Sequence, residues 1–192
     1  MEPNFDTIFM TGPQGSGKGT QGKRLAAKLG FFSWDTGAEL RAIAAQDTPL
    51  GHEVAGIING GQFLSDEMLI RILEDRLPAI PEGKGIIFDG VPRRMGQAEY
   101  ILGFLKSKPR KGMVTIHIDL PREESVKRLL LRAKTEGRVD DTPEAIDKRL
   151  QFFDEVIMPV MEVLKKETRY LMIDGRPSMD EVEKSIDDAL GI

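Results

Sequence analysis

Residues 12–20 read Gly-Pro-Gln-Gly-Ser-Gly-Lys-Gly-Thr, and these types at this spacing suit phosphate binding. Glycines let consecutive backbone N–H groups curl around a polyphosphate without clashes from Cβ atoms. Lys18 adds a positive charge for the outer phosphate oxygens. An apolar run at 8–10 precedes the stretch, and a helix-like segment at 23–29 follows it. Strand, glycine-rich turn and helix is the order that a phosphate-binding loop requires, so we predict a nucleoside triphosphate site.

Short apolar segments alternate with segments of helical periodicity along the chain. The expected strands are at 7–11, 85–89, 113–119 and 169–173, with a short one near 31–34. Expected helices lie at 38–45, 65–77, 97–106, 123–134, 143–166 and 179–190, and Pro159 should kink the long one. The strands are apolar at consecutive positions, as strands buried on both faces are. We predict an α/β fold: the three-layer P-loop NTPase fold, with a parallel five-stranded sheet covered by helices on both faces.

Three motifs follow expected strands directly. They are the loop at 12–20, the Asp-Thr-Gly sequence at 35–37 and the Asp-Gly-Val-Pro-Arg sequence at 89–93. In parallel sheets with helices on both faces, ligands bind beyond the carboxyl ends of the strands. We therefore expect all three motifs to meet in one cleft.

Composition limits the classes of partner. At 192 residues the chain is expected to form one domain, and its net charge of −4 argues against general nucleic-acid binding. We expect no membrane partner and a cytoplasmic location, because no apolar run approaches membrane-spanning length and no basic region precedes a long apolar one at the N-terminus. The absence of cysteine excludes disulfides and a cysteine-rich zinc site, so we expect no structural zinc.

The loop at 12–20 and the motif at 89–93 also support a resemblance. Most P-loops place a hydroxyl residue directly after the lysine, but here Gly19 occupies that position and Thr20 follows it. This ending resembles nucleoside monophosphate kinases, above all adenylate kinases, which usually have proline at the position of Gln14. The sequence at 89–93 resembles their Asp-Gly-Phe-Pro-Arg motif, with Val91 in place of phenylalanine. The resemblance extends over residues 7–190.

For the donor nucleotide, the resemblance rests on residues 128–149. Arg128 and Arg132 are at helical spacing, and 137–144 read Gly-Arg-Val-Asp-Asp-Thr-Pro-Glu, which looks like the lid of short-form adenylate kinases. The resemblance implies that Asp89 positions Mg²⁺ through water. It also implies that ATP is bound by a set drawn from the loop, the lid and the turn after the last strand: Gly15, Ser16, Gly17, Lys18, Gly19, Thr20, Arg128, Arg132 and Pro177.

For the acceptor, residues 35–41 resemble the family's Ser-Thr-Gly-Asp-x-Leu-Arg motif, and 61–67 resemble its Gly-x-x-Val/Leu-x-Asp-Glu motif. Gln97 matches a glutamine that reads adenine, and its amide offers the donor and acceptor that adenine N1 and N6–H need. The AMP-binding residues implied by the resemblance are Thr36, Gly37, Arg41, Gln62, Phe63, Leu64, Gly90, Val91, Pro92, Arg93, Gln97, Arg138 and Arg149.

The resemblance implies a short-form adenylate kinase that transfers the ATP γ-phosphoryl group reversibly to AMP. Such transfer needs alignment and charge neutralisation more than covalent help from the protein. The expected organisation is a single kinase domain, 1–192, with an acceptor-binding subdomain at 35–64 and a short lid at 131–141, and we expect a monomer. The residues expected to be catalytic are Lys18, Arg93, Arg132, Arg138 and Arg149.

Two other functions stay open at this point. The first is a kinase for UMP, CMP or another nucleoside monophosphate; Thr36 and Gln97 favour AMP, because uridylate/cytidylate kinases tend to have alanine and asparagine there. The second is a nucleotide sensor that binds without transfer. A sensor would be expected to have lost Lys18 or one of the arginines, and the chain has all of them.

Overall fold

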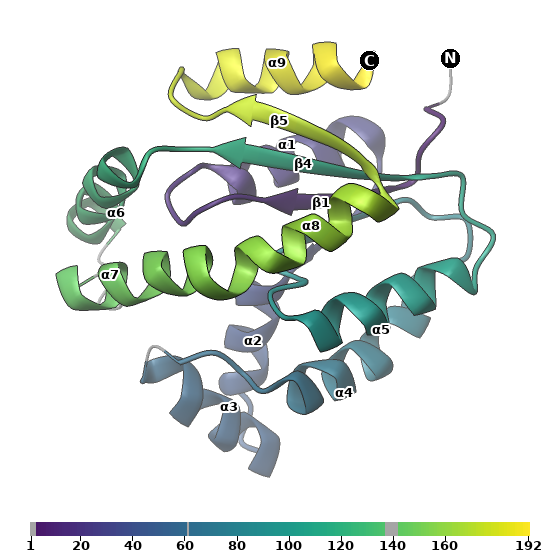
Figure 1. Ribbon diagram of the computed structural model, residues 1–192. Coiled ribbons are helices and arrows are strands. Elements are labelled where there is room, and N and C mark those ends of the chain that lie inside the picture. The colour runs from purple at the N-terminus through teal and green to yellow at the C-terminus, as the bar shows by residue number, and fades with distance from the viewer. Residues whose placement is uncertain (1–2, 61, 137–141) are drawn as a thin grey trace.

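The computed structural model describes residues 3–60, 62–136 and 142–192. Within these residues one parallel sheet contains five strands in the order β2-β3-β1-β4-β5, and Figure 1 labels three of them, β1, β4 and β5. The predicted α/β fold and its parallel sheet are confirmed. The strands are β1 (Thr7–Thr11), β2 (Phe32–Asp35), β3 (Ile86–Asp89), β4 (Met113–Asp119) and β5 (Arg169–Asp174).

Helices alternate with the strands along the chain and lie on both sides of the sheet (Figure 1). Those that precede β4 are α1 (Lys18–Leu29), α2 (Thr36–Ala44), α3 (Pro49–Asn59), α4 (Asp66–Arg76), a 3₁₀ turn (Leu77–Ala79) and α5 (Met95–Lys106). Those that follow β4 are α6 (Arg122–Glu136), α7 (Pro143–Phe152), a π-helical turn (Phe153–Ile157), α8 (Met158–Glu167) and α9 (Met179–Leu190).

Helices cover both faces of the sheet, which explains the continuous apolar runs of its strands. Ile8 and Met10 of β1 pack in one core cluster with residues of α1 and α9. Phe9, between them in sequence, packs in another cluster with α5 and α8, and its ring stacks on Phe88 of β3 with centroids 5.3 Å apart. Successive side chains of a strand point to opposite faces, so a strand buried on both sides needs apolar residues at every position.

Two helical predictions need correction. The helix α3 was absent from the expected set, although Thr48 caps it by accepting a hydrogen bond from the Gly51 N–H and Pro49 occupies its first turn. The expected single helix at 143–166 is interrupted by the π-helical turn Phe153–Ile157. Pro159 lies in the first turn of α8, just after this turn. Proline has no N–H and clashes with the carbonyl four residues earlier, so the ladder of hydrogen bonds widens there.

Helix starts depend on local capping, which also explains one departure from the family motif. The α2 helix begins at Thr36, because the Asp35 carboxylate accepts a hydrogen bond from the Ala38 N–H at 3.0 Å. Aspartate caps a helix as well as the serine that the family motif has at this position. Ser65 caps α4 in the same way, by accepting from the Met68 N–H at 3.3 Å.

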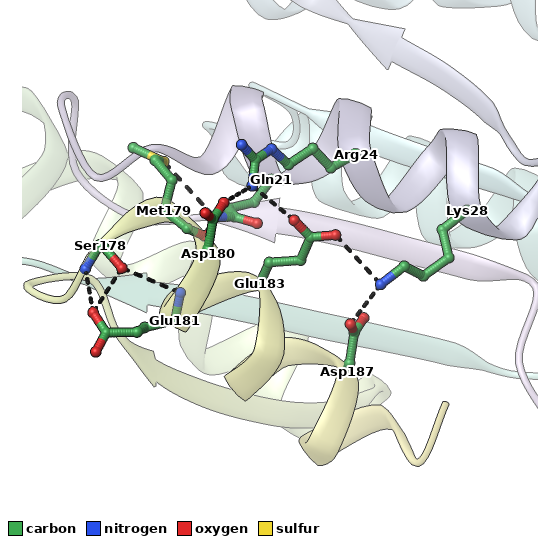
Figure 2. Close-up of polar contacts among 9 residues, drawn as sticks. All are labelled: Gln21, Arg24, Lys28, Ser178, Met179, Asp180, Glu181, Glu183 and Asp187. Atoms are coloured by element: carbon green, nitrogen blue, oxygen red, sulfur yellow. Dashed lines mark hydrogen bonds and ion pairs between the residues drawn. The ribbon is translucent and has the colours of Figure 1, made fainter.

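Polar contacts hold α9 against α1, the helix that begins in the phosphate loop (Figure 2). The Gln21 side chain, 1% exposed, donates from Nε2 to the Met179 carbonyl at 2.7 Å. Arg24 donates to the carboxylates of Asp180 and Glu183 at 2.7 Å each. Exposed ion pairs contribute little to stability, whereas a buried amide that loses its partner costs much more. Gln21 is therefore the contact expected to matter most.

We expect Gln21→Leu to lower the free energy of unfolding by about 1–3 kcal/mol, because the Met179 carbonyl would lose its buried donor. Urea denaturation measures this. Gln151→Leu is the matched control: its amide is exposed and donates to Glu155 at 2.8 Å, so the change there should stay within about 0.5 kcal/mol. Equal effects of the two substitutions would contradict the role given to Gln21.

Among the helices of the described ranges, none is long and apolar enough to cross a membrane.

Candidate active site

The phosphate loop connects β1 to α1 through a turn that depends on glycine. Gly12 has φ of 134°, and a Cβ there would lie 2.3 Å from the Ile118 carbonyl oxygen of the neighbouring strand β4. Gly17, the residue before α1, is left-handed with φ of 88°, and no described side chain caps the helix. The first N–H groups of an uncapped helix favour an anion, as does the positive end of its dipole. This geometry suits the predicted triphosphate site.

Lys18 is the first residue of α1, and its ammonium group is enclosed. It donates to the Pro13 carbonyl at 3.2 Å across the loop. Burial lowers the pKa of Lys18 to about 8; nearby Asp89 opposes this, while Arg93 and Arg132 lower the pKa further. Positive charges from three separate segments therefore converge on the loop, which is what a site for several phosphate charges needs.

Asp89 ends β3 directly beside the loop. Its Oδ2 lies 3.0 Å from where a Cβ on Gly19 would stand, and its Oδ1 is buried without a hydrogen-bond partner among the described residues. Burial raises the pKa of Asp89, and the Lys18 charge opposes that rise. The part of the chain that the structure describes has no cluster of three or more histidine, cysteine or acidic residues that could hold a metal. Mg²⁺ usually binds one or two carboxylates together with water and phosphate, so Asp89 fits a water-mediated magnesium site.

The acceptor residues expected from the sequence surround a cavity of about 620 Å³. It brings together α2, the segment between α3 and α4, the turn after β3 and α7. Of the predicted AMP-binding residues, those on the cavity wall are Thr36, Gly37, Arg41, Gln62, Phe63, Leu64, Gly90, Arg93, Gln97 and Arg149. Val91 and Pro92 instead line a smaller hollow beside Lys18, and Val91 is buried in the core. Their contact with AMP stays a prediction.

Arg93 links the cavity to the loop, because it lines both the acceptor cavity and the hollow beside Lys18. Its guanidinium carbon lies 5.0 Å from the centroid of the Phe63 ring. Burial lowers the pKa of Arg93; the Asp89 charge opposes this, and the Arg149 charge lowers the pKa further. Arg93, in the turn after β3, and Arg149, on α7, thus face one cavity, which suits binding of an acceptor phosphate.

Gln97 has a fixed orientation. Its Oε1 accepts from the backbone N–H of Arg93 at 2.8 Å, and its Nε2 donates to Asp66 at 2.9 Å. An N–H on one side and a carboxylate on the other determine which end of the amide is which. The Thr36 hydroxyl is held similarly: it donates to the Asp89 carbonyl at 2.8 Å and accepts from the Trp34 indole at 3.0 Å.

The residues expected at the donor nucleotide are spread around the loop. Ser16 is buried and Thr20 is exposed. Arg128 of α6 donates to the Arg176 carbonyl at 3.1 Å, which brings it beside the turn that contains Pro177. Arg132, on the same helix, lies near enough to Lys18 to lower its pKa. Arg138 falls in 137–141, outside the described residues.

The cavity wall also contains residues that the sequence reasoning did not propose for the site. Gln14 lines both the acceptor cavity and the hollow beside Lys18, and its Oε1 is buried without a described hydrogen-bond partner. Arg94 and Phe152 line the cavity as well. Arg94 follows Arg93 directly in sequence. Phe152 is three residues after Arg149 on α7, so helical spacing could have indicated that Phe152 and Arg149 share a face of that helix.

A parallel sheet covered on both faces, with a phosphate loop next to an arginine-lined cavity, defines a P-loop phosphotransferase. Comparison with known proteins identifies the family. Residues 10–169 match the family model for adenylate kinase. The chain is 40% identical over 183 residues to an adenylate kinase of Maricaulis maris, covering 95% of this chain and 97% of that protein. It is 39% identical over 175 residues to one from Phocaeicola vulgatus, covering 91% and 93%. The chain belongs to the adenylate kinase family.

The pKa of Lys18 makes triphosphate binding depend on pH. Above about pH 8 the free protein loses the Lys18 charge, whereas phosphate would hold the ammonium protonated. We expect the affinity for ATP to fall as pH rises from 8 to 9.5, with uptake of a proton on binding. Calorimetry in buffers of different ionisation enthalpy measures this. Lys18→Met should bind more weakly and lose the proton uptake; the same uptake in that variant would contradict the assignment.

The same shift affects stability with a definite sign. The pKa of Lys18 falls from its usual 10.5 to about 8 on folding, so the unfolded chain binds more protons between these values. Lys18 therefore adds stability to the folded, nucleotide-free protein as pH rises through this window, and adds none below it.

Proposed function

We propose that the protein transfers the γ-phosphoryl group of Mg-ATP to AMP, reversibly, to give two ADP. The observation that carries this proposal is the junction between the two halves of the site. The phosphate-loop hollow and the acceptor cavity share Gln14, Gly90 and Arg93 in their walls. Two phosphates placed on either side of Arg93 would therefore be next to each other, as direct transfer demands.

The residues at this junction supply alignment and charge. Lys18 and Arg93 are enclosed, and a fixed positive charge acts on phosphate oxygens more strongly there than in water. The planar guanidinium of Arg93 can hold two oxygens of the acceptor phosphate at once. Magnesium, when bound with ATP, neutralises part of the phosphate charge, and Asp89 would hold it through water.

The amide of Gln97 supports AMP as the acceptor. Arg93 and Asp66 each use one hydrogen-bonding site of the amide. One lone pair of Oε1 and one hydrogen of Nε2 stay available. This pair matches N6–H and N1 of adenine. UMP or CMP is the alternative acceptor, and a sensor without transfer is the alternative function. The enclosed charges of Lys18 and Arg93 favour an enzyme over the sensor.

We also propose that the acceptor-binding subdomain, 35–64, and the short lid, 131–141, close over the substrates and exclude water. The α2 and α3 helices of the subdomain pack against each other and supply one wall of the acceptor cavity. Part of the lid lies outside the described residues. A cytoplasmic monomer that takes ATP and AMP, and ADP in reverse, completes the proposal.

The deciding experiment offers Mg-ATP with AMP, UMP, CMP, GMP and dTMP in separate reactions and follows diphosphate formation. Rapid ADP formation with AMP alone supports the proposal. Preference for a pyrimidine would keep the transfer and replace the acceptor. Tight nucleotide binding without transfer to any monophosphate would favour the sensor.

We expect Lys18→Ala, Arg93→Ala and Arg138→Ala each to retain at most about a thousandth of wild-type turnover, because a transition-state cation contributes roughly 10³–10⁵ in rate. Turnover and circular dichroism should be measured together, so that loss of folding is not mistaken for loss of catalysis. Near-normal turnover in all three variants would refute the site.

Asp66 should contribute to acceptor choice through Gln97. Asp66→Ala removes the acceptor of Gln97 Nε2, so the amide can rotate, and we expect the preference for AMP over UMP to fall about tenfold in kcat/KM. Asp66→Asn is the matched control, since its side-chain oxygen can still accept that hydrogen bond while the negative charge is lost. Equal selectivity in the two variants would show that the hydrogen bond has no such role.

A further inference from the structure

Four side chains on the wall of the acceptor cavity form a continuous stack. The rings of Phe63 and Phe152 lie with centroids 4.1 Å apart and planes at 19°. The guanidinium carbon of Arg93 is 5.0 Å from the Phe63 centroid, and that of Arg94 is 5.2 Å from the Phe152 centroid. We call this set, Arg93, Phe63, Phe152 and Arg94, the aromatic column. Two adjacent arginines thus contact two different rings.

A second set of contacts joins the ends of the column. Gln97 accepts from the Arg93 N–H and donates to Asp66, as described above. Asp66 in turn lies 4.0 Å from the Nε of Arg94. The column, Gln97 and Asp66 therefore make a closed loop of contacts. Displacing Phe63 or Phe152 would therefore also disturb Gln97 and Asp66, which are joined to the arginines and not to the rings.

The two rings come from parts of the chain that are far apart in sequence. Phe63 lies in the stretch between α3 and α4, which we call the acceptor segment and which belongs in part to the acceptor-binding subdomain, 35–64, whereas Phe152 ends α7. Both rings are partly exposed and line the cavity, and Phe152 also packs against the larger core cluster. The α7 helix also supplies Arg149 to this cavity. The stack consequently ties the acceptor segment to a helix that carries a predicted catalytic arginine.

Stacking restricts side chains that would otherwise move freely. An arginine has many rotamers, and fixing one before the ligand arrives removes an entropic cost from binding. A guanidinium group is weakly hydrated and stacks well on an aromatic face. Offset or parallel ring pairs add to this attraction beyond simple burial. Arg93 would therefore already be placed for the acceptor phosphate.

We infer that Phe152 is a positioning residue of the acceptor site: through Phe63 it holds Arg93 in place and keeps the acceptor segment against α7. The inference rests on the proposed function only for the identity of the acceptor, AMP. A residue that merely filled space would be replaceable by any apolar side chain of similar size. A positioning role needs the aromatic ring.

Phe152→Leu and Phe152→Tyr separate these two roles. We expect Phe152→Leu to raise the KM for AMP about tenfold, with the KM for ATP and kcat within about twofold of wild type. Phe152→Tyr keeps the ring and should behave as wild type. Fluorescence of Trp34, the sole tryptophan, gives AMP affinity independently, since its indole is bonded to Thr36 in the cavity wall.

Phe104→Leu is the matched control. The Phe104 ring also has a cation over it, Lys108 at 5.7 Å, but it lines a different hollow. We expect it to leave the KM for AMP unchanged. An unchanged KM in Phe152→Leu, or an equal rise in the leucine and tyrosine variants, would overturn the inference.

A double-mutant cycle tests the contact without any ligand. Phe63→Leu, Phe152→Leu and the double variant are compared by urea denaturation. We expect the double variant to be less destabilised than the sum of the single variants, because either change alone already breaks the stack. Strict additivity would overturn the inference. If the wild type made no ADP from AMP, the proposed function would fail, and this cycle would still decide whether the column exists.

Discussion

Positive charge gathered around one buried carboxylate is the constraint on which the rest of the structure depends. Lys18 and Arg93 are both enclosed, and burial lowers the pKa of each. Asp89 opposes that effect on both, while neighbouring arginines add to it. Asp35 opposes it as well, but two carboxylates cannot balance the charges of Lys18, Arg93, Arg132 and Arg149, so the site favours an anion. Only a rigid frame can keep like charges this close, which makes the sheet edge and its helices part of the chemistry.

Two features build this frame: the backbone geometry of the sheet and the side-chain contacts between the elements around it. The central strand β1 is buried on both faces, and it delivers the glycine turn between the carboxyl ends of its two neighbours, β3 and β4. Side-chain contacts then join separate elements: Gln21 of α1 bonds the Met179 carbonyl of α9, and the aromatic column ties the acceptor segment to α7. Backbone geometry places the loop, and side-chain packing places the arginines.

The parts that could be predicted from sequence are those whose chemistry is local. The loop at 12–20 and the turn at 89–93 carry their function in adjacent residues, and the continuous apolar strands follow from burial on two faces. Helix α3 was missed because Gly51 and Gly56 weaken its helical pattern. Gly51 is needed there, since a Cβ would lie 2.2 Å from the Gln46 carbonyl. The Phe63–Phe152 stack depends on tertiary packing, which local patterns do not encode.

The bond between Gln21 and Met179 has a consequence for synthesis of the chain on the ribosome. The helix that begins in the phosphate loop is made among the first residues, but its packing partner α9 is the last helix that the structure describes. Translation proceeds at about 5–20 residues per second, so α1 waits roughly 8–32 seconds for α9. A nascent chain therefore contains the phosphate loop and α1 long before α9 is available to pack against them.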